Sequence, residues 1–498
     1  MHLTLKEIKK AYSVLKKSVF KAYNDGNLEL TISRIGEAVE YVQQFNWIYT
    51  DDDLEQILDD ISKKKLSHPV GYIPNTDRAV IFDDWCTSYV LVMQYIEALS
   101  LNFKEVLYIT GRDVAAMSYN NILEAIKQYP NVKISLIPQN PNSFERSQLI
   151  LDTIISFQPS KLFLHIGFNS PITLALYSLP KSIDRYLINL ADQTFWLGSK
   201  GIDFTLEFRP FGATVSYEKR RLKKEQLLYL PFYPYRDGNE FKGFPELTKG
   251  KVVIFSGGDF YKTLDPDYTY WDLVKDVLIE NPEAIFLFAT KNIIGKTDDF
   301  LHNFVTKNNL TDRFIYIGFR PDIDEVFKHC DIFMGTCPVC GSLTSQLAAL
   351  NSKPILQYYL PNTYDDETEQ AICHNAKIQI SFTDKELFLK EAKRLIQNKI
   401  YREQQGKLIN QAMFTREQFN QKFGDVVTTN YAPPPFKNID YDTVAERWWW
   451  CEKLEFFNTL QQLFGILGKH NFLMEFPLIG YKYYANRIIG KMRRIIKR

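Results

Sequence analysis

The segment MGTCPVCGSLTSQLAALNSKPIL, residues 334–356, contains the pattern on which much of the chain is built. An apolar strand ends, a loop rich in glycine, serine and threonine turns the chain, and a helix is expected from about 343 to 350 before the next apolar strand. The unpaired amides and hydroxyls at the start of this helix predict a site for an anion such as a diphosphate. Ser342 and Thr344 could instead serve only as N-caps of the helix, a role in which both residue types are common.

The same alternation of strand and helix continues on both sides of this segment. Nearly continuous apolar runs between helical stretches are typical of parallel sheets covered by helices on both faces. A polar segment at 239–250 divides the runs into two sets, which predict two facing, doubly wound, Rossmann-like domains of the α/β class. Ligands are expected in the cleft between the carboxyl ends of their strands. The runs lie at 79–82, 106–109, 134–137, 162–166, 186–188, 252–255, 284–288, 314–317, 331–334 and 354–356.

The chain of 498 residues is too long for one hydrophobic core, and its pattern predicts four regions. A helical N-terminal region is expected at 1–70, the first Rossmann-like domain at 71–240, the second at 241–430, and a helical tail at 431–498. Within the N-terminal region, the acidic run 51–53 and the basic run 63–65 predict the start and the end of one helix, because their charges suit its dipole.

The charge balance argues against chain-wide attraction to nucleic acid, because 60 Lys and Arg residues face 59 Asp and Glu residues, a net charge of +1. The sequence predicts neither an export signal nor a membrane span. Six cysteines in so long a chain do not suggest a disulfide framework. These features predict a protein of the reducing cytoplasm.

A second phosphate-binding element is predicted at the start of the second domain, in VIFSGGDFYK, residues 253–262. A strand ends in the small residues Ser256 and Gly257, and Lys262 follows shortly after. Such a turn lets the backbone approach a phosphate while the ammonium group neutralises it. Because both elements lie at strand carboxyl ends of one sheet, they predict a nucleotide-diphosphate site assembled from two loops.

With these loops in its second domain, the layout resembles the GT-B glycosyltransferases. More narrowly, residues 77–422 resemble the branch that contains the O-linked N-acetylglucosamine transferases and their bacterial relatives. In that branch a strand, a small-residue turn and a lysine contact the donor diphosphate, which implies this role for Ser256, Gly257 and Lys262. A G-H-T-T-type loop at a helix start implies donor contacts for Gly341, Ser342 and Thr344, although Ser342 replaces the family's histidine and Leu343 one of its threonines.

The first domain carries a further part of the resemblance. The runs 165–170, 190–198 and 202–203 resemble the family's D-x-x-G-Y-T, W-L-G and D-Y sequences, and the family's acid falls on His165. Three candidates for the catalytic base remain open. His165 ends an apolar strand and has a side-chain type whose pKa suits base chemistry near neutrality. Asp192 follows another strand, and the pair Asp83 and Asp84 follows the first strand. Each could instead have a purely structural role.

The resemblance implies an inverting hexosyltransferase that moves a sugar from a nucleotide diphosphate, with UDP-N-acetylglucosamine as the family's donor, to a hydroxyl group. The first domain would hold the acceptor, which could be a glycan, a lipid-linked glycan or a protein, as in the synthesis of surface polysaccharide or glycoprotein. No acidic residue occurs between Asp331 and Asp365, which favours inversion over retention. The departing diphosphate would be stabilised by Lys262 and the helix N-terminus without a metal or another cofactor. A GT-B epimerase or hydrolase, or a silent sugar-nucleotide-binding scaffold, remains an alternative.

Cysteine and histidine side chains near the predicted phosphate loop have the right atoms for zinc. Cys337 and Cys340 form a C-x-x-C pair, with Cys373 and His374 downstream. Cysteines in such apolar surroundings are more often small buried side chains, so we predict no metal site.

The tail from 481 onward combines apolar residues at spacings of three and four with seven cations and no acid. A basic amphipathic helix of this kind is typical of segments that lie on an anionic membrane surface. We therefore predict peripheral association with the inner face of a membrane, with packing on the protein's own body as the alternative. The cations are Lys482, Arg487, Lys491, Arg493, Arg494, Lys497 and Arg498.

Overall fold

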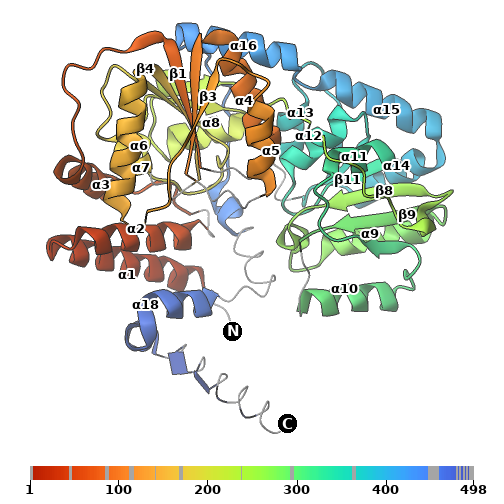
Figure 1. Ribbon diagram of the computed structural model, residues 1–498. Helices are drawn as coiled ribbons and strands as arrows, with labels where there is room; N and C mark the ends of the chain where they lie inside the picture. Colours follow the sequence, from red (N-terminus) through yellow and green to blue (C-terminus); the bar gives the residue numbers. More distant parts are fainter. Residues whose placement is uncertain are drawn as a thin grey trace.

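The computed structural model contains two parallel β-sheets, each covered by helices (Figure 1). It describes residues 4–43, 47–84, 89–111, 117–140, 142–167, 172–236, 238–291, 296–361, 366–446 and 459–477, and the single residues 480, 481, 484, 485, 488 and 492. All strand pairs within the two sheets are parallel. The predicted fold class, two Rossmann-like α/β domains, is confirmed.

The first sheet has the strand order β3-β2-β1-β4-β5-β6-β7, and the second has the order β10-β9-β8-β11-β12-β13. In each sheet the chain order reverses beside the first strand, between β1 and β4 and between β8 and β11. Ligands bind at such a switch point, outside the strand carboxyl ends. The strands are β1 (Asn75–Asp83), β2 (Glu105–Thr110), β3 (Val132–Leu136), β4 (Pro159–His165), β5 (Asp184–Ile188), β6 (Phe204–Glu207), β7 (Leu227–Tyr229), β8 (Val252–Gly257), β9 (Ala284–Ala289), β10 (Phe314–Tyr316), β11 (Ile332–Met334), β12 (Ile355–Tyr358) and β13 (Ser381–Phe382).

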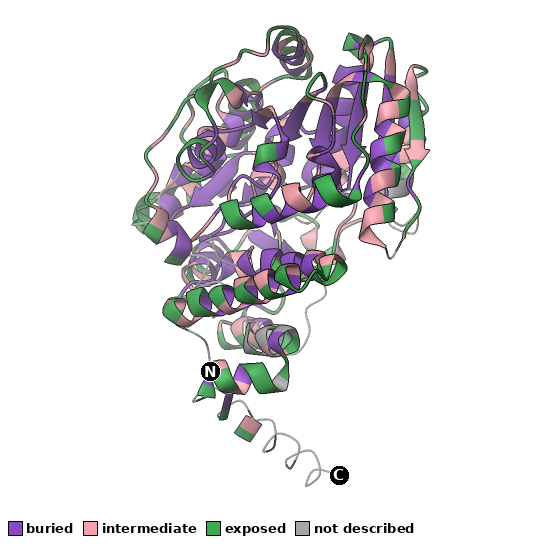
Figure 2. Cartoon of the chain, turned by 90° about the vertical axis from the view of Figure 1, so that its left-hand side faces the viewer, coloured by how far each residue is buried: buried purple, intermediate pink, exposed green. Residues whose placement is uncertain are grey.

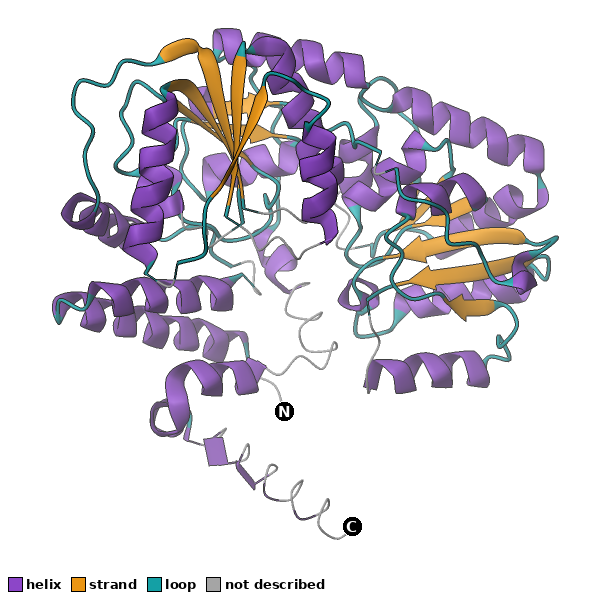
Figure 3. Cartoon of the chain, viewed as in Figure 1, coloured by secondary structure: helices purple, strands orange, loops and turns teal. Residues whose placement is uncertain are grey.

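Helices cover both faces of each sheet, and Figure 3 shows the two layered units side by side. Most strands are largely buried, whereas the edge strand β3 and the outer faces of the helices are exposed to solvent (Figure 2). The helices of the first unit are α4 (Tyr89–Asn102), α5 (Met117–Ile126), α6 (Ser143–Phe157), α7 (Ile172–Leu176) and α8 (Pro210–Glu218). Those that follow β8 are α9 (Thr269–Glu280), α10 (Lys296–Lys307), α11 (Ile323–His329), α12 (Ser342–Leu350), α13 (Glu367–Ile372), α14 (Lys385–Gln397), α15 (Lys399–Ala412) and α16 (Arg416–Thr429).

The N-terminal helices share a hydrophobic core with one face of the first sheet. Helices α1 (Leu5–Asn24), α2 (Leu28–Val42) and α3 (Asp52–Lys65) contribute buried side chains to the same cluster as β1, β2 and β4. As predicted, α3 begins in the acidic run and ends in the basic run; the Asp51 carboxylate caps its first turn. This region is therefore an integral layer of the first domain.

Helix α16 lies within the sequence range predicted for the second domain but packs on the first. Phe419 and Phe423 belong to the core on the opposite face of the first sheet, and the Phe423 ring lies 5.4 Å from that of Phe163. The Arg416 guanidinium forms an ion pair with Glu97 of α4 at 2.7 Å. The chain thus returns to its first domain after completing the second.

The C-terminal helix α18 (Thr459–Glu475) packs beside α1 (Figure 1). Phe472 and Phe476 are buried in the core of the N-terminal helices, and the Lys10 ammonium lies 4.8 Å from the Phe476 ring. Within the described part of the chain, no helix combines the length and apolarity needed to cross a membrane.

Substitution of Phe423 by alanine should destabilise the first domain, because it leaves a cavity in a core contributed by two distant parts of the chain. We expect a loss of about 3–5 kcal/mol in the free energy of unfolding, measured by urea denaturation. Phe436→Ala, at a side chain that is largely exposed, is the matched control and should change stability much less. Equal losses for the two variants would contradict this role of α16.

Candidate functional site

A cavity of about 510 Å³ lies at the carboxyl ends of β8 and β9 and against the start of α12. Gly257 and Lys262 line it from the first predicted phosphate element, and Thr344 lines it from the second. Tyr89 and Val90, at the start of α4, add a wall from the first domain. The structure therefore brings the two predicted elements together at one cavity between the domains.

Helix α12 begins without a side-chain cap. Its N-cap residue is Gly341, which has no side chain to accept a hydrogen bond from the first-turn amides. Ser342 and Thr344 lie inside the helix, so the alternative in which they serve only as N-caps is wrong. The amides of this first turn are therefore available to an anion, since the first amides of a helix have no partner within it.

Glycines allow the backbone after β8 to approach its neighbours closely. A Cβ atom on Gly257 would lie 3.0 Å from the carbonyl oxygen of Ala289, and the Gly258 amide donates to that same oxygen at 3.0 Å. Ser256 is different, because it is fully buried and its hydroxyl accepts a hydrogen bond from Tyr270 at 2.6 Å. Gly257 thus borders the cavity, whereas Ser256 belongs to the core beneath it.

A second cavity, of about 180 Å³, adjoins the first and lies between the domains. Lys262 lines both cavities, so its side chain borders the place where they adjoin. Ser342 lines the smaller one. The first domain contributes Gln193 and Arg209, and the second contributes Glu367 at the start of α13. Neither Arg209 nor Glu367 was predicted from the sequence, because no motif marks either residue.

Arg209 connects the two domains through buried charges. Its Nε and Nη2 atoms donate to the two carboxylate oxygens of Asp192 at 2.6 and 2.8 Å, and its Nη1 lies 3.6 Å from Oε2 of Glu367. The Cys340 thiol donates to the same Glu367 oxygen at 2.9 Å. Burial alone would lower the pKa of Arg209, but the two carboxylates more than offset it and hold this pKa well above its usual value. Asp192 is thus a buried ion-pair partner, which does not favour it as a base.

His165 and Asp83 form a buried pair at the switch point of the first sheet. They are register partners on β4 and β1, and His165 Nδ1 lies 2.7 Å from Oδ1 of Asp83. The Tyr108 hydroxyl donates to the other Asp83 oxygen at 2.7 Å. Asp84, also buried, donates its backbone amide to the His165 carbonyl at 3.0 Å. Both His165 and Asp83 are 0% exposed, and neither lines the two cavities described above.

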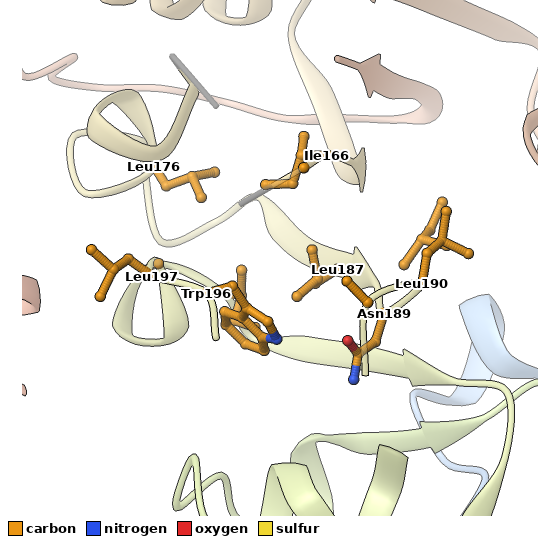
Figure 4. A pocket seen from close by; sticks show the side chains of 12 residues that line it. Ile166, Leu176, Leu187, Asn189, Leu190, Trp196 and Leu197 are labelled. Atoms are coloured by element: carbon orange, nitrogen blue, oxygen red, sulfur yellow. The ribbon is translucent and has the colours of Figure 1, made fainter. Parts of the chain in front are cut away.

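A small apolar cavity of about 20 Å³ lies beyond the end of β4, between Ile166, Leu187 and Trp196 (Figure 4). It has room for about one water molecule. Its Trp196 and Leu197 belong to the run that resembles the family's W-L-G sequence, and Figure 4 shows both on the loop after β5. This cavity is too small for a sugar ring.

Among the described side chains, no group of three or more His, Cys, Asp or Glu residues could hold a metal ion. His374 Nε2 lies 3.2 Å from the carbonyl oxygen of Ala371, and burial lowers the pKa of His374 to about 4. Cys340 is directed at Glu367, as described above.

Comparison with known proteins supports the fold. A solved structure of a Thermobaculum terrenum O-GlcNAc transferase variant matches 90% of this chain and 85% of its own, with 13% sequence identity and a TM-score of 0.52. Anabaena HepE in complex with UDP and glucose matches 70% of this chain and 99% of its own at 11% identity, with a TM-score of 0.48. A putative UDP-N-acetylglucosamine 2-epimerase from Listeria monocytogenes matches 73% and 100% at 10% identity, with a TM-score of 0.49.

The chain therefore has the GT-B fold, which the match to the O-GlcNAc transferase structure shows. No protein-family model matches the sequence, and no curated protein matches it closely enough to count as a relative.

Proposed function

We propose that this protein is an inverting glycosyltransferase that uses a nucleotide-diphosphate sugar as its donor, with UDP-N-acetylglucosamine as the donor that its family resemblance implies. The observation that carries the proposal is the meeting of Gly257, Lys262 and the uncapped start of α12 at one cavity, which adjoins a second cavity between two GT-B domains. A helix N-terminus and an ammonium group are well suited to bind a diphosphate.

The larger cavity would hold the nucleotide. Phe319 is 62% exposed and lines this cavity, so its ring offers a face on which a nucleobase can stack. The diphosphate would lie at Lys262 and the first turn of α12, and the sugar would extend into the smaller cavity. There Arg209 and Glu367 supply a hydrogen-bond donor and an acceptor for sugar hydroxyls.

For the chemical step we propose His165 as the base, oriented by Asp83. A proton on Nδ1 shared with Asp83 leaves Nε2 as the basic nitrogen. The acceptor hydroxyl would attack the anomeric carbon as its proton passes to His165, and the bond from that carbon to the diphosphate would break. Lys262 and the α12 amides would stabilise the negative charge on the departing diphosphate.

One observation favours a second candidate function, binding of a sugar nucleotide without transfer. His165 is fully buried and lines neither cavity, which is the arrangement expected of a structural histidine. The two candidate functions share the donor site and differ only at the acceptor side.

Lys262→Met should weaken binding of UDP, because it removes a cation that would neutralise the diphosphate. Loss of a charge-assisted hydrogen bond of about 1.5–3 kcal/mol corresponds to a roughly 10- to 100-fold rise in the Kd for UDP. Isothermal titration calorimetry measures this, with Lys307→Met, at an exposed residue on α10, as the control. If Lys262→Met binds UDP as tightly as the wild type, Lys262 is not part of the donor site.

His165→Ala should abolish sugar transfer and leave UDP binding intact, since the base acts on the acceptor. General-base catalysis contributes about 10²–10⁴-fold to a rate. Transfer is measured by product analysis with UDP-sugars and candidate acceptors, and His165→Gln serves as a variant that fills more of the buried space. Near-wild-type turnover in either variant would exclude His165. UDP binding without turnover in the wild-type chain would support the second candidate function.

We also propose that the tail holds the protein at the inner face of an anionic membrane. Tyr481, Ile488 and Met492 are 77%, 53% and 55% exposed. Apolar side chains that insert into a membrane surface are expected to be exposed in this way. Tyr484 contacts helix α18, with its ring 5.8 Å from that of Phe464. The seven cations, and Ile495 at the next apolar position of the tail, lie outside the described residues.

A variant truncated after Gly480 should lose sedimentation with vesicles that contain phosphatidylserine, because each cation near such a surface contributes about 1 kcal/mol. Full-length protein with neutral phosphatidylcholine vesicles is the control and should remain in the supernatant. If the truncated protein still sedimented fully with anionic vesicles, the tail would not be the anchor.

A further inference from the structure

Glu55, on helix α3 of the N-terminal region, is a carboxylate with no exposed surface. Its Oε1 accepts hydrogen bonds from the Gly198 amide at 2.7 Å, from the Ser199 amide at 3.0 Å and from the Ser199 hydroxyl at 3.1 Å. Its Oε2 accepts from the Lys200 amide at 3.4 Å and from the Tyr177 hydroxyl. A buried charge is tolerated only when it is hydrogen-bonded in this way.

Glu55 binds the amides at the start of the 3-10 helix η1 (Ser199–Gly201). The N-cap residue of this turn, Gly198, has φ +105°, a conformation that favours glycine. No side chain of the turn itself caps these amides. The cap comes instead from Glu55, which lies more than 140 positions earlier in the chain.

From this turn, a series of contacts leads to the smaller cavity. The Trp196 amide donates to the Tyr49 carbonyl at 3.3 Å, so the N-terminal region also holds the residue before the turn. The Arg220 guanidinium lies 4.8 Å from the Trp196 ring and donates to the carbonyls of Asp192 and Thr194 at 2.8 and 2.6 Å. The Asp192 side chain in turn fixes Arg209, as described above.

We infer that Glu55 is a positioning residue for the loop 189–202, which forms the first-domain wall of the smaller cavity. By fixing the loop 189–202 at its far end, it holds Gln193 and, through Asp192, Arg209 in the smaller cavity. The inference rests on the proposed function, since it assigns the N-terminal helices a part in placing the groups that meet the sugar. Glu55 itself lines neither of the two cleft cavities.

Glu55→Gln tests this inference with little change of shape. The amide nitrogen that replaces one carboxylate oxygen is a donor, so it cannot accept the hydrogen bonds made there. We expect kcat for sugar transfer to fall about 10- to 100-fold through misplacement of the wall, with the Kd for UDP unchanged. Amide hydrogen exchange in 190–202 should accelerate, while exchange in β8 and β9 should not.

Two further variants make the test specific. Asp59→Asn, one turn later on α3, alters a surface pair with Lys63 and should leave kcat and exchange unchanged. Ser199→Ala removes one hydrogen bond to Glu55 and should shift both readouts in the same direction but less, which keeps the inference testable if Glu55→Gln folds poorly.

Combination with Arg209→Lys separates positioning from general destabilisation. If both residues act through the same wall, the double variant Glu55→Gln/Arg209→Lys should turn over no more slowly than the slower single variant. Fully multiplicative effects, unchanged exchange in 190–202, or a matching loss of UDP affinity would overturn the inference. If the proposed function is wrong, the wild-type chain itself will transfer no sugar. The hydrogen-exchange measurement would then still show whether Glu55 holds the loop 190–202 in place.

Discussion

One buried cation links the two domains at the cleft. Arg209 is buried, and Asp192 of its own domain neutralises it through two hydrogen bonds. Glu367 of the other domain lies 3.6 Å from the same guanidinium, an attraction that exists only when the domains face each other. The contact between Arg209 and Glu367 therefore ties the first-domain side of the cleft to the second domain.

The alternation of apolar runs and helices was sufficient to predict the fold. All ten predicted runs lie in or overlap strands, because parallel strands buried on both faces leave a signal that needs no alignment. The strands β6, β7 and β13 were missed. Each is four residues long or shorter, and β7 and β13 form sheet edges, where short strands are common and the apolar signal is weak.

The candidate site was only partly predictable. Gly257 ends β8, and Lys262 and the start of α12 follow β8 and β11 within a short loop, so the sequence places them at one sheet edge. The burial of Ser256 depends on a hydrogen bond from Tyr270 in the next helix, and the pairing of His165 with Asp83 depends on strand order. Arg209, Glu367 and Glu55 owe their positions to contacts between elements far apart in sequence, which no local pattern encodes.

The docking of α18 on α1 has a mechanical consequence. Helices α1 and α18 both belong to the layer beneath the first sheet, so a tail held on a lipid surface would fix the molecule through its first domain. The second domain, which carries the predicted diphosphate elements, would then project from the tether without an attachment of its own to the surface.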